Sequence, residues 1–234
     1  VLLCLCITTT LSAQENKRVQ DFKKRILSDP GVLTLKFSDE RQSPSLIVYN
    51  NQKALYPRQM AGSILSQYLA LRQGIDAVEL SNQSFLPNNI EVLEFQQKFK
   101  GIIVEYGTFK AMLVNGNIHL FNGAWYDIPS AVSAKPALTL NAALHKAKEK
   151  VNARTYATDF FQKEIDKTLD PKVKDALYKE MQDASPKGEL VFVKDFTREG
   201  AAQIKLAWKF DIYATEPMSR SWVYVDAQTG KILL

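Results

Sequence analysis

The chain has 234 residues, of which 46% are hydrophobic and 24% charged, a globular composition that excludes an intrinsically disordered protein. The formal net charge is +5, but acidic residues are interspersed among the lysines, and the longest basic run is Lys23, Lys24 and Arg25. Because this run lies on a predicted amphipathic helix, it indicates a solvated helix face, and nucleic acid is not an expected partner.

Residues 1–13 are apolar or small and carry no charge, and they end in Ser12 and Ala13. This pattern is typical of the apolar core and cleavage region of a secretory signal peptide, so we expect a secreted or periplasmic protein. A bilayer span needs about 20 apolar residues, so stable membrane insertion is not expected. A buried strand or short helix is the alternative for this segment. A lipoprotein signal is weaker, because neither Cys4 nor Cys6 follows a small-residue box.

Both cysteines of the chain lie inside this N-terminal segment. The mature chain would therefore have none, which excludes a disulfide framework and a thiolate zinc site. Export without disulfides favours a bacterial exported protein over a small eukaryotic secreted domain.

The first half of the chain predicts helices followed by an antiparallel meander. Apolar spacing predicts a helix within 15–28 and a second from Pro57 to Leu71, ended by Gly74. Turn sequences at Lys100-Gly101, around Gly107 and at 115–117 predict short connections between adjacent strands. The predicted strands are 32–37, 45–49, 78–80, 91–99, 102–104, 108–114 and 118–121.

The second half repeats this order after a linker at 129–136. An apolar stripe predicts a helix over 140–151, and 155–182 continues helically with a break at Asp170-Pro171. The predicted strands are 189–194, 204–214, 221–225 and 231–234. The chain therefore predicts an α+β fold of two modules, each an antiparallel sheet with helices packed on one face.

No catalytic set is recognisable in the sequence. His119 and His145 are the only histidines, and neither belongs to an HExxH pair or has a second ligand at metal-binding spacing. A Ser-His-Asp site assembles in space and is not excluded by spacing, but no GxSxG elbow is present. We therefore expect no catalytic residue, metal or cofactor in this chain.

The segment from Asp226 to Gly230 predicts a hairpin turn. Asp226 can accept hydrogen bonds from amides two or three residues on, and Gly230 can take a positive φ. Thr229, Gly230 and Lys231 do not form a P-loop, because the upstream glycine is missing. Asp226, Thr229 and Gly230 are therefore expected to be structural residues.

The tryptophans allow two interpretations. Trp125, Trp208 and Trp222 lie on or near predicted strands, where aromatic side chains either pack in the core or form an exposed stacking platform. Core or hairpin packing is the favoured interpretation.

Several segments of the first half together resemble the fungalysin/thermolysin propeptide (FTP) module: residues 61–81, 93–104 and 114–123. The family's motif of a phenylalanine, paired polar residues, a glycine turn and an apolar-valine pair falls on Phe95, Gln96, Gln97, Gly101 and Val104. Glu105 and Tyr106 stand where the family usually has Phe-Gly. The FTP-like domain would cover 14–128, with the clearest match over 61–123.

The second half resembles a PepSY domain. Residues 140–151 would be its helix, and 206–212 and 222–233 its closing strands, so that the domain covers 137–234. The helical insertion 155–182 is longer than is typical of PepSY domains. The resemblance implies a cystatin-like fold for each module.

Tandem FTP and PepSY modules behind a signal peptide resemble the prodomain of secreted zinc metallopeptidases of the thermolysin and fungalysin types. This implies an intramolecular chaperone and inhibitor that is cleaved off. Its partner would be the cognate catalytic domain in cis, and zinc would be expected only in that domain, after Leu234. Two alternatives remain: a free-standing exported PepSY-type module that binds a peptidase or peptide in trans, and an enzyme in its own right.

Overall fold

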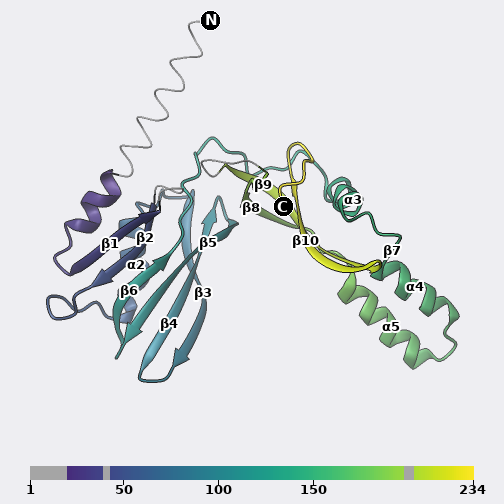
Figure 1. Cartoon of the computed structure of the whole chain (residues 1–234), viewed down its shortest axis with the longest axis horizontal. Helices are drawn as coiled ribbons and strands as arrows, with labels where there is room; N and C mark the ends of the chain where they lie inside the picture. The colour runs from purple at the N-terminus through teal and green to yellow at the C-terminus, as the bar shows by residue number, and fades with distance from the viewer. Residues whose placement is uncertain (1–19, 39–42, 198–202) are drawn as a thin grey trace, which may run out of the picture. The chain divides into compact units, whose positions relative to one another are not determined.

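The computed structural model describes residues 20–38, 43–197 and 203–234. The chain divides into two compact units, which we call unit 1, up to Val132, and unit 2, from Ser133. Each unit combines an antiparallel sheet with helices, so the predicted α+β class is confirmed (Figure 1). The predicted signal peptide, residues 1–13, lies outside the described residues.

Unit 1 is built on one twisted sheet. Its strands follow the order β1-β2-β6-β5-β4-β3, and every neighbouring pair is antiparallel. The strand bounds are β1 Val32–Ser38, β2 Ser43–Tyr49, β3 Asp76–Leu86, β4 Ile90–Phe99, β5 Ile102–Val114 and β6 Asn117–Gly123.

Pairs of residues with positive φ make the tight connections of this meander. Lys100 and Gly101 have φ values of 50° and 80°, and Asn115 and Gly116 have 51° and 78°. Asn88 and Asn89 do the same between β3 and β4, at 64° and 54°. Two successive residues of positive φ define the type I′ turn, whose twist matches that of the flanking strands. The predicted turns at Lys100-Gly101 and 115–117 are therefore correct.

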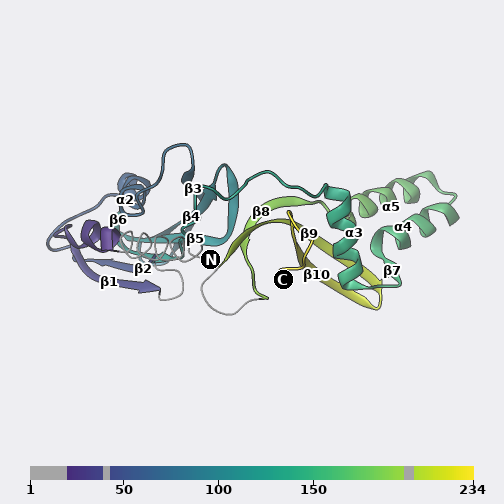
Figure 2. The same cartoon turned by 90° about the horizontal axis from the view of Figure 1, so that it is seen from above.

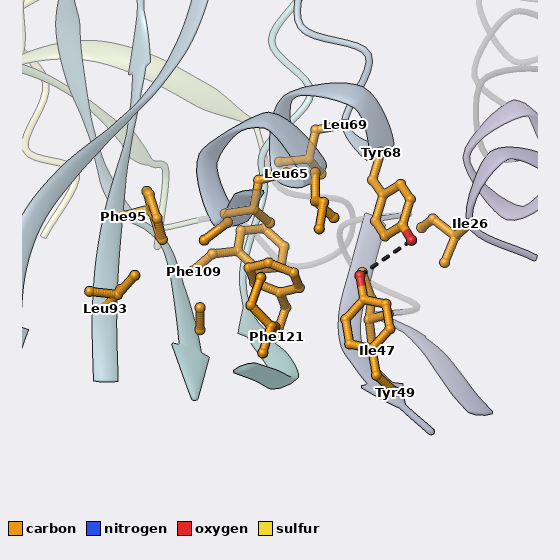
Figure 3. Packing of buried hydrophobic residues seen from close by; sticks show 14 of the residues in the cluster. Ile26, Ile47, Tyr49, Leu65, Tyr68, Leu69, Leu93, Phe95, Phe109 and Phe121 are labelled. Atoms are coloured by element: carbon orange, nitrogen blue, oxygen red, sulfur yellow. Dashed lines mark hydrogen bonds between the residues drawn. The ribbon is translucent and has the colours of Figure 1, made fainter. Parts of the chain in front are cut away.

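The helices of unit 1 pack on one face of its sheet. Residues 20–27 are helical, and a short 3-10 turn η1, Arg58–Met60, leads into α2, Ala61–Tyr68. Ile26, Leu65 and Leu69 are fully buried and join strand residues in one cluster (Figure 3). The strand residues of that cluster are Ile47, Tyr49, Leu93, Phe95, Phe109, Ala111, Leu113, Ile118 and Phe121.

The second helix is shorter than the sequence predicts. It ends at Tyr68 rather than Leu71, because Ala70 takes a φ of 46° and the amide of Leu71 donates to the carbonyl of Ser66. This is the Schellman arrangement, which normally uses glycine. Gly74, with φ of 70°, belongs instead to the turn that leads into β3.

Two strands also differ from the predicted bounds. The predicted strand 78–80 is part of the longer β3, whose residues 79–86 are exposed at the sheet border and lack an apolar alternation. The predicted strands 102–104 and 108–114 are one strand, β5, and Gly107 lies in a bulge of it rather than in a turn.

Unit 2 has the sheet order β8-β9-β10, with the two-residue β7 paired to the end of β9. The strands are β7 Thr155–Tyr156, β8 Glu189–Lys194, β9 Ile204–Glu216 and β10 Met218–Asp226, and the helices are α3 Leu140–Val151, α4 Ala157–Lys167 and α5 Pro171–Ala184. The predicted helical segment 155–182 with a break at Asp170-Pro171 is thus confirmed, except that Thr155 and Tyr156 form the strand β7. The predicted strand 231–234 forms a single bridge, between Ile232 and Val225.

Helix α3 covers one face of this sheet. Thr139 caps it by accepting a hydrogen bond from the amide of Ala142. Ala143 and Ala147 of α3 are fully buried in a cluster with strand residues Phe210, Ile212, Val223 and Val225. These four alternate along β9 and β10, so they share one face of the pleated sheet. Within the described residues, no helix is long and apolar enough to cross a membrane.

Candidate functional site

The paired glutamines of the FTP-like motif lie beside the bulge in β5. The ladder between β4 and β5 pairs Gln96 with Thr108 and then Lys98 with Ile103, so residues 104–107 bulge out of it. The side-chain amide of Gln96 donates to the carbonyl oxygens of Val104 at 2.8 Å and of Gly107 at 3.1 Å. Backbone carbonyl groups that leave a strand ladder still need a hydrogen-bond donor. Gln96 supplies this donor to Val104 and Gly107, whose carbonyl groups lie in the bulge.

Gln97 is buried and joins β4 to the segment after β6. Its Nε2 donates to the carbonyl oxygen of Tyr126 at 2.7 Å, and its Oε1 accepts from the amide of Tyr126 at 3.0 Å. A Cβ atom on Gly107 would lie 2.6 Å from Gln97 Oε1. A carbon atom cannot lie so close to that oxygen, so position 107 requires glycine, which has no side chain.

The remaining motif residues also have structural roles, in core packing or in a turn. Phe95 is buried in the core cluster, and Val104 is fully buried in the bulge. Gly101 adopts the positive φ of its turn. The structure thus brings the motif together at one end of β4 and β5, where its side chains hold the backbone.

The predicted hairpin residues lie at the end of β10. Asp226 Oδ1 accepts from the amides of Gln228 at 2.8 Å and Thr229 at 3.1 Å. The amide of Gly230, with φ of 75°, donates to the carbonyl of Asp226 at 2.8 Å. The hydroxyl of Thr229 accepts from the amide of Lys231. These contacts are those of a self-contained Asx turn.

The histidines do not converge. His119 lies in β6, and His145 pairs with Glu149 one turn away on α3 at 3.1 Å, with both side chains largely exposed. In the described ranges, no three His, Cys, Asp or Glu side chains are grouped so that they could hold a metal ion.

A tyrosine–aspartate cluster in unit 1, formed by Asp29, Tyr49, Tyr56 and Tyr68, was not anticipated from the sequence. Asp29 follows the first helix; its Oδ2 accepts from Tyr68 at 2.6 Å, and its Oδ1 accepts from Tyr56 and from the amide of Gly31. Tyr49 in turn donates to Tyr68 at 3.2 Å (Figure 3). The cluster ties the first helix to α2 and to β2.

The charge states follow from these contacts. Burial pushes the pKa of Asp29 upward, but the hydrogen bonds from Tyr56, Tyr68 and Gly31 outweigh it and leave the pKa below its ordinary value of 3.8. Burial and the nearby carboxylate raise the pKa of Tyr56 to about 12. The aspartate is therefore ionised and the tyrosine neutral at neutral pH, as a structural clamp requires.

Strand β10 of unit 2 carries two large, exposed apolar side chains. Pairing of β9 with β10 places Met218, Trp222 and Tyr213 on the sheet face opposite α3. Met218 is 78% exposed and Trp222 is 53% exposed. The Lys209 ammonium lies 4.4 Å from the centre of the Trp222 ring. We call Tyr213, Met218 and Trp222 the β9–β10 surface.

The tryptophans therefore do not form one platform. Trp125 is fully buried in unit 1, and Trp208 donates its indole N–H to the carbonyl of Leu138 at 3.0 Å. The expected core packing thus describes Trp125 and half-buried Trp208, but not exposed Trp222. A separate polar hollow of about 720 Å³ lies beside the β9–β10 hairpin and is lined by Asn152, Ala153, Arg154, Thr215, Glu216 and Pro217.

Comparison with known proteins gives only distant likenesses. No family model matches the chain, and no curated protein sequence matches it. Among solved structures, the C-terminal domain of YpeB from Bacillus megaterium aligns at 10% identity, with 92% of this chain and 94% of that chain covered and a TM-score of 0.34. An uncharacterized protein from Eubacterium rectale aligns at 10% identity, with 93% and 80% covered and a TM-score of 0.37. At these scores neither likeness bears on function.

Proposed function

We propose that the chain is the prodomain of an exported zinc metallopeptidase, which helps the catalytic domain to fold and inhibits it until it is cleaved off. The resemblance of its two halves to FTP and PepSY modules motivates the proposal. The observation that carries it is the β9–β10 surface, where Met218 and Trp222 are both exposed on one face of β10, because exposed apolar side chains gathered on one face commonly mark an interaction site.

Exposed aromatic side chains of this kind are typical anchors of protein interfaces. Tryptophan is enriched among residues that dominate binding energy, and methionine adapts to irregular partner surfaces. Met218 and Trp222 lie on the same face of β10, and Arg220 lies between them on that face. A folded partner covering both would remove a large apolar area from water.

Binding of this surface to the folded catalytic domain explains both roles. A ligand that binds the native state but not the unfolded state stabilises the native state by mass action. A covalent tether makes that binding intramolecular, so that even a modest affinity is sufficient before cleavage. Cleavage removes the tether, and dissociation then relieves inhibition.

The first test is the coding sequence after Leu234, where we expect an HExxH-containing domain. The second is refolding of that domain with and without residues 14–234. The yield of active enzyme should fall at least 10-fold when these residues are omitted. Equal yields would refute the chaperone role, and an open reading frame that stops at Leu234 would refute the prodomain.

The surface itself is tested with a double variant, Met218→Ser with Trp222→Ser. We expect its inhibition constant against the mature catalytic domain to rise by roughly 10- to 100-fold, because an interface tryptophan commonly contributes about 2 kcal/mol or more to the binding free energy. Leu169→Ser is the matched control, since Leu169 is 95% exposed between α4 and α5. An unchanged constant for the double variant, with its thermal unfolding also unchanged, would place the inhibitory surface elsewhere.

A further inference from the structure

The last residues of the chain run along the outer edge of β10. The amide of Asp226 donates to the carbonyl of Lys231 at 2.8 Å, and the amide of Leu233 donates to the carbonyl of Tyr224 at 2.9 Å. The amide of Tyr224 donates to the carbonyl of Leu234 at 3.2 Å. Residues 231–234 are thus antiparallel to β10 and advance along it from Asp226 toward Trp222.

The rest of that edge is unpaired in the described part of the chain. Backbone groups of successive strand residues point to opposite sides, and those of Tyr224 and Asp226 point outward to residues 231–234. By alternation, the amide and carbonyl groups of Trp222 and Arg220 also point outward. Ser219 and Ser221 point inward to β9, with which they pair at Ala214 and Ile212.

The open edge is also continuous with the terminal segment. Both views show β10 at a border of the unit 2 sheet, with the C-terminus beside it (Figure 1 and Figure 2). The short strand β7 pairs with β9 and so leaves the outer edge of β10 open. An exposed strand edge is a template for another extended chain.

A second copy of this chain is a poor occupant of the edge. Antiparallel self-pairing that matched Met218 with Trp222 of the copy would place Arg220 opposite its own counterpart, and like charges directly opposite are unfavourable. A separate peptide would have to begin where Leu234 ends, because residues 231–234 already occupy the adjoining edge. The polypeptide that follows Leu234 meets neither obstacle.

We propose that the polypeptide following Leu234 continues as an added strand on β10, antiparallel to it and hydrogen-bonded to the backbone of Trp222 and Arg220. This inference rests on the proposed function, in which a catalytic domain follows. The added strand would hold the start of the junction in an extended form, and its side chains on the face opposite α3 would lie beside Trp222.

Hydrogen–deuterium exchange tests this pairing, on the natural precursor and on the chain ending at Leu234. We expect the amides of Trp222 and Arg220 to exchange at least 10-fold more slowly in the precursor. The amides of Ser219 and Ser221 are the internal control, because their bonds to β9 exist in both proteins. Equal exchange at Trp222 and Arg220 would overturn the inference.

A variant of the precursor isolates the backbone contribution. Arg220→Pro removes an amide that points outward and leaves the bonds to β9 intact. Proline is tolerated at such a position, because the lost amide does not belong to the ladder with β9. Exchange at Trp222 should rise several-fold over that in Arg220→Ala, which loses the same side chain. Equal exchange in the two variants, with the precursor's protection intact, would show that Trp222 is covered by something other than a paired strand.

The outcomes separate this inference from the function on which it rests. If residues 14–234 inhibit a catalytic domain encoded downstream but Trp222 and Arg220 exchange as before, only the added strand is wrong. If the reading frame stops at Leu234, both proposals fail. A concentration-dependent dimer of the chain ending at Leu234, with both amides protected, would assign the edge to a second copy and overturn the inference.

Discussion

Unit 1 and unit 2 differ in the side chains that distinguish them: a set of buried polar groups in unit 1 and an exposed tryptophan and methionine on one strand in unit 2. In unit 1, the glutamine Gln97 and the carboxylates of Asp29 and Asp76 are buried or partly buried and bind groups of the same unit. In unit 2, Trp222 and Met218 are exposed on the sheet. These buried polar groups of unit 1 therefore find their partners within that unit, although unit 1 also exposes Phe85 and Leu86. The surface that we propose for partner binding lies in unit 2. We therefore expect substitutions at the buried polar groups of unit 1 to lower its stability, and substitutions on the β9–β10 surface of unit 2 to weaken partner binding.

The largest effect on stability is expected for Gln97→Leu. Both backbone groups of Tyr126 would lose their hydrogen-bond partner in a buried position, which costs about 3 kcal/mol in the free energy of unfolding. Urea unfolding followed by tryptophan fluorescence measures it, in a background with Trp208→Phe and Trp222→Phe so that Trp125 of unit 1 gives the signal. Gln67→Leu is the matched control on an exposed position of α2, and a loss of similar size there would contradict the internal-clamp interpretation.

Asp29→Asn should lower the free energy of unfolding of unit 1 by about 2 kcal/mol at neutral pH. The change weakens two tyrosine hydrogen bonds and one backbone bond to a charged acceptor. Asp21→Asn, on the exposed face of the first helix, should have little effect. A near-zero difference between the two variants would mean that the tyrosine–aspartate cluster does not stabilise unit 1.

The same cluster predicts a pH dependence. The pKa of Asp29 is lower in the folded chain than its ordinary value of 3.8, so its contribution is fully present above that value. It is lost as the pH falls through the lower folded pKa. The difference in free energy of unfolding between the protein and Asp29→Asn should therefore shrink below about pH 4. A difference that is constant from pH 7 to pH 3 would rule out this linkage.

The smallest effect is expected in the hairpin of unit 2. Gly230→Ala forces alanine into a φ of 75°, with an expected cost of about 1 kcal/mol. Gly116→Ala imposes the same strain in unit 1, at φ of 78° with open space around the added methyl group. Unfolding curves of the two variants should show similar losses, each in its own unit. A much larger loss for Gly230→Ala would show that Lys146 and Leu138, which its methyl group approaches, cannot move aside.

Local signals in the sequence predicted most of the fold. The Asn-Gly and Lys-Gly turns are correct because two residues of positive φ need few other conditions. Helix α3 was predicted from its apolar stripe, and the break at Asp170-Pro171 follows from proline geometry. The errors arose where one residue has two possible roles. Gly107 allows a turn as well as a bulge, and only its approach to Gln97 decides between them.

The candidate sites depended on contacts that no local pattern contains. Asp29 meets Tyr56 and Tyr68 across 27 and 39 positions of sequence, so the sequence indicated only that the aspartate follows a helix. The motif around Gln96 and Gln97 was found by resemblance, but its hydrogen bonds to Val104, Gly107 and Tyr126 required the register of β4 on β5. Exposure of Trp222 required the pairing of β9 with β10, because alternation alone does not say which face is covered.

The connection between the units is fastened at both ends. In unit 1, Arg72 donates to the carbonyl of Ile128 at 2.8 Å, and Lys100 donates to that of Val132 at 2.9 Å. In unit 2, Gln228 donates to the carbonyl of Lys135 at 2.7 Å. Only residues 133–134 of the described chain lie between these anchors. Because a protease must bind several residues in an extended and unfastened form, this short connection should be a poor site for limited proteolysis, although it is the boundary between two compact units.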